Sequence, residues 1–108
     1  MKLLTKTLHD QLVRNGRISA ALAEDGRAEA DFYPIMKLFT PDTACTCLLT
    51  ELDPEDLDVA FGLCDLGFGC PELGTVRISE LESVRGMLSL PVERDLHFVT
   101  RHTLSVYP

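Results

Sequence analysis

Carboxylates are concentrated in the middle third of the chain, where they could bind a cation or a basic surface. Between Lys37 and Arg77 the sequence has no Lys or Arg but eight acids, within a chain of 108 residues whose net charge is −7. An acidic surface attracts a basic protein partner. It disfavours direct nucleic-acid binding, because that affinity comes from Lys and Arg that displace counterions. The candidate binding residues are Glu51, Asp53, Glu55, Asp56, Asp58, Asp65 and the aromatic Phe68.

The run DPEDLD at residues 53–58 has the oxygen ligands that Ca²⁺ prefers, but not the spacing of an EF-hand. Such a loop needs Gly at its sixth position and Glu at its twelfth. Counting from Asp53, these positions hold Asp58 and Cys64. We therefore interpret the run as a solvated acidic turn, since Asp followed by Pro is typical of a type I turn. No metal site is predicted.

The segment AFGLCDLGFGCPELG at residues 60–74 holds four of the seven glycines and two of the four cysteines. A phosphate cradle needs glycines whose N–H groups converge at a helix N-terminus, usually with a Lys. Gly67, Gly69 and Gly74 have a different spacing and no base nearby. The segment therefore predicts a loop between two strands in which glycine supplies positive φ. No cofactor is predicted.

The four cysteines have the wrong spacing for a zinc knuckle. Structural zinc sites use C-x₂₋₄-C pairs, whereas Cys45 and Cys47 form C-x-C and Cys64 and Cys70 form C-x₅-C. We expect thiols that pack as small hydrophobic side chains. A cytoplasmic location, where thiols stay reduced, is expected from the absence of a secretory signal at the N-terminus and of any membrane-spanning apolar stretch.

The histidines give no catalytic signature. His9, His97 and His102 are scattered, and none lies in a local motif with a nucleophile. The sequence therefore favours a protein without catalytic residues. One alternative is a small metal-dependent hydrolase whose site is assembled across space from Asp65, His97 and the cysteines. Another is an accessory subunit of a larger complex.

The N-terminal third that precedes these segments is predicted to be helical. Leu4, Leu8 and Leu12 recur at helical spacing, with Thr5 as N-cap and Gly16 as the C-terminal stop, so a helix is expected over about residues 5–15. RISAALAEDG at residues 17–26 predicts a second short helix that its last glycine ends.

From Pro34 onward the residue pattern is typical of short strands. Apolar, β-favouring runs are separated by turn residues, and Ser79 with Glu82 predicts a capping box for a helix closed by Gly86. The predicted strands are residues 34–40, 45–52, 57–66, 72–79 and 94–100. The sequence thus predicts an α+β fold in a single domain, residues 1–108: an N-terminal helix, an antiparallel sheet of four to five short strands, and a short helix near residues 79–86.

Several motifs resemble a family of short bacterial proteins known only as a domain of unknown function. The motifs are YPIMKLFTPD, LLTELDPED, AFGLCDLGFGCPELG, SELES and LPVERDLHF, and with the opening MKLLT they cover most of the chain from about Pro34 to Phe98. The resemblance implies a context on plasmids and other mobile elements, but no activity, cofactor or catalytic residue. Cys47 departs from the family pattern, which usually places a tryptophan or another bulky residue there.

Together, the acidic segment and the implied context predict a non-catalytic acidic binding protein. Its expected partner is the basic surface of another protein, with no direct nucleic acid and no membrane, and its oligomeric state is left open. In the implied context that surface would belong to host machinery that handles nucleic acid, so the protein would act as an inhibitor of the anti-restriction or anti-CRISPR type. Its carboxylates would replace phosphates in contact with Lys and Arg.

Overall fold

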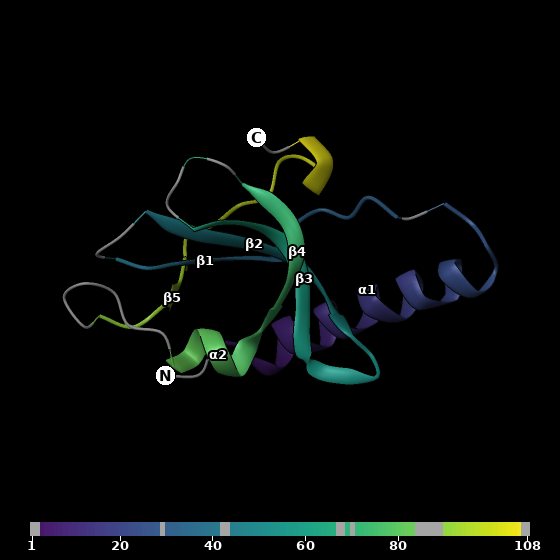
Figure 1. Cartoon of the computed structure of the whole chain (residues 1–108), viewed down its shortest axis with the longest axis horizontal. Helices are drawn as coiled ribbons and strands as arrows, with labels where there is room; N and C mark the ends of the chain where they lie inside the picture. The colour runs from purple at the N-terminus through teal and green to yellow at the C-terminus, as the bar shows by residue number, and fades with distance from the viewer. Residues whose placement is uncertain are drawn as a thin grey trace.

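A five-stranded antiparallel sheet with one long helix packed against it confirms the predicted α+β fold (Figure 1). The computed structural model describes residues 3–28, 30–41, 44–66, 69, 71–83 and 90–106. In chain order the elements are α1 (Lys6–Glu24), β1 (Met36–Phe39), β2 (Cys45–Asp53), β3 (Asp56–Leu66), β4 (Glu72–Arg77), α2 (Ile78–Ser83), β5 (Glu93–Arg94) and the 3-10 helix η1 (Leu104–Val106). The strand order is β4-β3-β2-β1-β5.

The predicted break at Gly16 is wrong, because α1 continues through this residue to Glu24. Gly16 is buried in the middle of the helix, and a Cβ built on it would lie 1.8 Å from the carbonyl oxygen of Leu52 on β2. The glycine therefore allows the helix backbone to approach the strand backbone. The two helices expected over residues 5–26 are one.

Both ends of α1 follow local rules. The Thr5 side chain accepts a hydrogen bond from the N–H of Leu8, as predicted for the N-cap. At the other end Gly26 has φ +64°, and the N–H of Arg27 donates to the Leu22 carbonyl, which is the pattern of a Schellman motif. The predicted stop at Gly26 is therefore confirmed.

The four long strands lie within two residues of their predicted bounds, but the fifth is much shorter than expected. β5 contains only Glu93 and Arg94, which pair with Phe39 and Leu38 of β1. Directly after it, the Asp95 carboxylate accepts the N–H of His97. This local turn ends the pairing, so the strand predicted over residues 94–100 does not form.

The short helix α2 begins directly after β4 and is not capped as predicted. Ser79 lies inside the helix, where its N–H donates to Asp58 Oδ1 at 2.9 Å and its hydroxyl to Asp58 Oδ2 at 2.6 Å. A carboxylate from β3 therefore takes the role expected of Ser79. Glu82 instead accepts the N–H of Leu3, and Gly86, the predicted end of the helix, lies outside the described residues.

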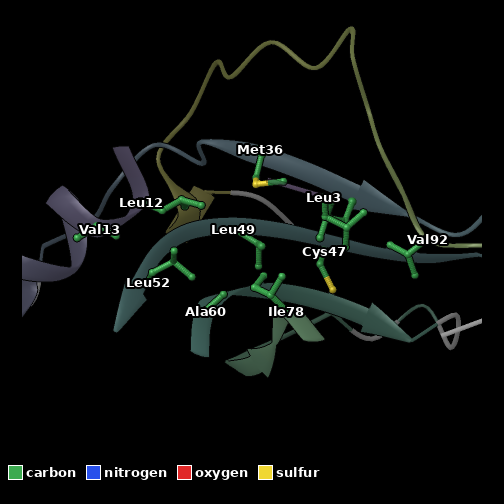
Figure 2. Close-up of a cluster of buried hydrophobic side chains, with 11 residues drawn as sticks. Leu3, Leu12, Val13, Met36, Cys47, Leu49, Leu52, Ala60, Ile78 and Val92 are labelled. Carbon is green, nitrogen blue, oxygen red and sulfur yellow. The ribbon is translucent and has the colours of Figure 1, made fainter. Parts of the chain in front are cut away.

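The core fills the space between α1, one face of the sheet, α2 and the start of the chain (Figure 2). Leu12 and Leu52 lie toward one end of this cluster, and Leu3, Cys47 and Val92 toward the other. Leu3 is 1% exposed, and its carbonyl accepts a hydrogen bond from Arg94. In the described part of the chain, no helix combines the length and the apolar character needed to cross a membrane.

The segment at residues 60–74 contains the end of β3, the predicted connection between the two strands and the start of β4. Gly69 has φ +73°, which confirms its predicted backbone role, whereas Gly67 lies outside the described residues. Gly62 and Gly74 are within the strands and pair with each other. A Cβ on Gly62 would lie 2.0 Å from the carbonyl oxygen of Leu48, so this glycine also permits a close approach of two backbones.

Candidate functional site

The acidic run forms the turn between β2 and β3, as its sequence predicted. Asp53 pairs with Asp56 across the hairpin, and Asp53 Oδ1 accepts the N–H of Glu55 at 2.9 Å. This is an Asx turn, in which the first carboxylate of the run closes the loop. Glu55 is exposed beside it.

Two of the candidate acids stabilise the structure around β4 and α2. Arg77 Nη1 lies 3.2 Å from Asp56 Oδ2 and 3.6 Å from Asp58 Oδ2. The hydrogen bonds from Ser79, with the Arg77 guanidinium beside them, lower the pKa of Asp58 below its usual value. The pKa of Arg77 is raised, chiefly by its hydrogen bond to Asp56. Asp56 and Asp58 are therefore partly occupied by interactions within the chain.

A β-bulge at Thr50 decides which side of the sheet Glu51 faces. Leu49 pairs with Gly62 and Glu51 pairs with Phe61, so Thr50 has no residue opposite it. In a regular strand Glu51 would share the buried face of Leu49, since side chains alternate. The extra residue moves Glu51 to the other face.

The bulge is held by hydrogen bonds on both sides. Asn15 Nδ2 of α1 donates to the Thr50 carbonyl oxygen at 2.9 Å, and the Thr50 hydroxyl donates to the Phe61 carbonyl oxygen at 3.3 Å. Thr50 is 1% exposed, so these bonds satisfy polar groups that water does not reach. Asn15 and the adjacent Gly16 thus dock α1 against the bulged part of β2.

A hollow of about 390 Å³, here called the hairpin groove, lies where α1 meets the β2–β3 hairpin. Its helix side consists of small side chains and its sheet side combines carboxylates, apolar groups and a threonine. The lining residues are Gly16, Ser19, Ala20, Ala23, Ala30, Glu51, Asp53, Pro54, Val59, Ala60, Phe61 and Thr75. This volume lies within the range of about 300–1,000 Å³ that is typical of ligand pockets.

The described lining of the groove contains two carboxylates and no base. Glu51 is half-buried and Asp53 is exposed, while Val59 and Phe61 are half-buried. The groove therefore offers negative charge beside an apolar wall. A side chain with an aliphatic stem and a cationic head, such as Lys or Arg, has the matching chemistry.

The comparisons with known proteins concern the whole chain. A family model described as "Protein of unknown function (DUF2958)" matches residues 3–108. The chain belongs to the DUF2958 family. This confirms the resemblance that the sequence motifs indicated. No curated protein and no solved structure matches this DUF2958 chain.

The hairpin groove of this DUF2958 protein brings together only some of the predicted binding residues. Glu51 and Asp53 line it. Asp65 lies opposite Thr46, four positions along β3 from Phe61, or roughly 13 Å at the rise of an extended strand. Phe68 lies outside the described residues. The sequence left open whether these acids are contiguous, and the structure distributes the described ones among the groove, the turn, the cap of α2 and the far part of β3.

Sequence reasoning missed the helix side of the groove. Gly16, Ala20 and Ala23 are small residues at positions i, i+4 and i+7, which is the spacing of one helix face. This signal was present in the sequence, but a glycine between two helical stretches was interpreted as a stop.

A second hollow, of about 470 Å³, lies beside β1 and the start of β2. Lys37 and Asp95 line it together with Phe39 and Cys45, so charges of both signs are present. It contains none of the predicted binding acids. The charge pattern therefore distinguishes the hairpin groove from this hollow.

The groups proposed for the alternative hydrolase site of this DUF2958 protein come from β2, β3 and the turn after β5. His97 is exposed in the turn after β5, and its N–H is bonded to Asp95. Cys47 and Cys64 lie opposite each other on β2 and β3, and Cys70 lies outside the described residues. Among the residues that the structure describes, no group of three or more His, Cys, Asp or Glu side chains is placed to hold a metal ion.

Proposed function

We propose that this protein is a non-catalytic binding protein whose hairpin groove receives a Lys or Arg side chain from the basic surface of another protein. The observation that supports this most directly is the placement of Glu51 and Asp53 beside Val59 and Phe61 in one groove. The bulge at Thr50 is what brings Glu51 to this side.

The groove suits a cationic side chain for two separate reasons. Its apolar wall removes the aliphatic stem of the ligand from water, and its carboxylates attract the cationic head. A ring such as that of Phe61 attracts a cation over its face as well. Glu55 and Asp56 lie at the adjacent turn, so the negative potential extends beyond the groove and steers a basic surface toward it.

The expected partner is a protein of the host that binds nucleic acid. A protein that binds nucleic acid carries Lys and Arg along its binding surface. An acidic protein that occupied this surface would exclude the nucleic acid, which is the mode of action expected of an inhibitor of host defence machinery. A short DNA or RNA duplex should therefore displace the protein from its partner.

The test uses a fluorescent peptide of alternating Arg and Gly and measures its binding by fluorescence anisotropy at several salt concentrations. The double substitution Glu51→Gln and Asp53→Asn removes both carboxylate charges from the groove. It leaves the turn intact, since an Asn side-chain oxygen also accepts the Glu55 N–H. We expect affinity to fall at least about tenfold, equivalent to about 1.4 kcal/mol.

A matched control removes the same charge elsewhere. Glu72→Gln with Glu93→Gln changes two exposed strand residues that do not line the groove. This control should retain most of the affinity. If both double variants weaken binding equally, the peptide responds to net charge and the groove is not its site. Failure of the native protein to bind the peptide would also refute the proposal.

A further inference from the structure

The structure places two cysteines from distant parts of the sequence side by side in the sheet. Cys47 on β2 is the register partner of Cys64 on β3. Residues directly opposite in an antiparallel pair have Cα atoms about 4.5–5.5 Å apart. Disulfides join residues whose Cα atoms are about 4.4–6.8 Å apart. The backbone therefore already has the spacing that a disulfide between these two residues needs.

The two thiols differ in exposure and in ionisation. Cys47 is 8% exposed, whereas Cys64 is half-buried. A hydrogen bond from the Cys47 thiol lowers the pKa of Cys64, although partial burial acts in the opposite direction. The same hydrogen bond, together with burial, raises the pKa of Cys47. Cys64 is thus the member of the pair that more readily forms the nucleophilic thiolate.

We propose that Cys47 and Cys64 form a reversible disulfide when the protein meets a peroxide oxidant. Cys64 is the more accessible thiol and reacts first. Its thiolate sulfur attacks one oxygen of hydrogen peroxide, an S–O bond forms, the O–O bond breaks, and the released hydroxide takes up a proton as water. The product at Cys64 is a sulfenic acid.

In the second step the thiol of Cys47 loses its proton and attacks the sulfenic sulfur of Cys64. The S–S bond forms, the S–O bond breaks, and a second molecule of water leaves. Two thiols are oxidised by two electrons and one peroxide is reduced to two waters. Cys47 is adjacent in the register, so no rearrangement of strands separates the two steps.

The disulfide would join the two strands that also form the hairpin groove. Glu51 and Phe61, which line the groove, pair with each other farther along β2 and β3. The link lies on the core side of the sheet, where Cys47 packs with Leu38 and Leu49. Oxidation is therefore expected to stiffen the hairpin without placing a new group in the groove.

The test treats the full-length protein with hydrogen peroxide, quenches it, and measures the intact mass and the linked peptides under non-reducing conditions. We expect the intact mass to fall by two hydrogen atoms, the peptide map to contain a Cys47–Cys64 linked peptide, and the melting temperature to rise. Dithiothreitol should reverse all three changes. A linked peptide that contains Cys45 or Cys70 in place of either residue would overturn the proposal. Formation of sulfinic acid without a disulfide would overturn it too.

Substitutions give an independent check. Cys47→Ser and Cys64→Ser should each abolish the loss of the two hydrogen atoms. Cys45→Ser is the matched control, because Cys45 lies two residues from Cys47 on the same strand, and this variant should still form the disulfide. Persistence of an intramolecular disulfide in Cys64→Ser contradicts the proposal. The peptide map of the native protein decides the question even if a serine variant does not fold.

Discussion

The carboxylates on the two sides of the β2–β3 turn are neighbours in sequence but have different surroundings. Glu51 and Asp53 on β2 line the hairpin groove. Asp56 and Asp58 on β3 contact Arg77, and Asp58 also caps α2 through Ser79. A run of acids in a sequence is therefore not by itself a binding surface. Where the chain also supplies a base and a helix N-terminus nearby, part of the run serves the fold.

The difference arises from the backbone. The bulge at Thr50 turns Glu51 toward the groove, and a second irregularity between Leu52 and Asp53 gives β3 more residues than β2 near the turn. Asp58 is one of these extra residues, and its carboxylate accepts from Ser79 at the start of α2. These carboxylates therefore form a groove half, Glu51 and Asp53, and a structural half, Asp56 and Asp58, although Asp53 Oδ1 also closes the turn.

The largest effect is expected from Gly16→Ala, which changes the helix side of the groove by one methyl group. Helix propensity alone predicts stabilisation of about 1 kcal/mol. Because the added Cβ would lie 1.8 Å from the Leu52 carbonyl oxygen, we expect destabilisation of about 2 kcal/mol. Urea denaturation measures the difference, and peptide binding should weaken with it. An increase in stability would show that α1 does not contact β2 as closely as the structure indicates.

The next effect is expected from Asn15→Ala, which removes the bond that holds the bulge. The Thr50 carbonyl would lose its donor in a part-buried position, so we expect a loss of about 1–2 kcal/mol. The Glu51 side chain would be held less firmly toward the groove, so affinity for the Arg-Gly peptide should also fall. Asn15→Asp serves as a control of similar shape, because a carboxylate cannot donate this bond, and it should behave like the alanine variant. Unchanged stability in both variants would exclude a role for Asn15 in holding the bulge.

These positions also show how far the sequence could predict the fold. The turn at Asp53, the N-cap at Thr5 and the stop at Gly26 each depend on a few adjacent residues, and all three were predicted. The first four strands were found because apolar runs are bounded by turn residues, whereas the fifth was predicted too long. Thus interactions within a short stretch were visible in the sequence.

The features that were missed depend on residues far apart in the chain. Gly16 contacts Leu52, and Asp58 caps a helix that begins twenty residues later. Neither partner can be inferred from the local pattern, so Gly16 was interpreted as a stop and Ser79 as a cap. The acids of the candidate site were identified from their charge. Which of them line the groove and which stabilise the fold depends on the irregularities in strand pairing, and the residue types alone do not indicate these.

A smaller effect, and one that depends on pH, is expected from Asp58→Asn. The pKa of Asp58 is lowered in the folded protein, chiefly by the hydrogen bonds from Ser79. Its contribution to stability is therefore present above the unfolded pKa of about 3.9 and is lost as the pH falls through the lower folded value. Asp58→Asn should lower the melting temperature at neutral pH and reduce the fall in stability below about pH 4.

Because Asp58 belongs to the structural half, Asp58→Asn should affect stability more than peptide binding. Peptide affinity, measured well below the melting temperature, should stay within about twofold of the native value, since Asp58 does not line the groove and exposed charges act weakly at a distance in salt. A loss as large as that of the groove variant would place Asp58 in the binding surface and remove the distinction between the two halves.

The smallest effect is expected from Glu55→Gln, at the tip between the two halves. Glu55 is exposed, and the turn is closed by its backbone N–H donating to Asp53, which the substitution leaves in place. It does not line the groove. The melting temperature should therefore be unchanged, and peptide affinity should fall by less than about twofold through the loss of one charge from the surrounding potential.

The measurement that decides most clearly is the salt dependence of peptide binding by Glu55→Gln, compared with that of the single variant Glu51→Gln. If Glu55→Gln weakens binding as much as Glu51→Gln at every salt concentration, affinity follows the total charge of the run. The hairpin groove would then have no special part in it.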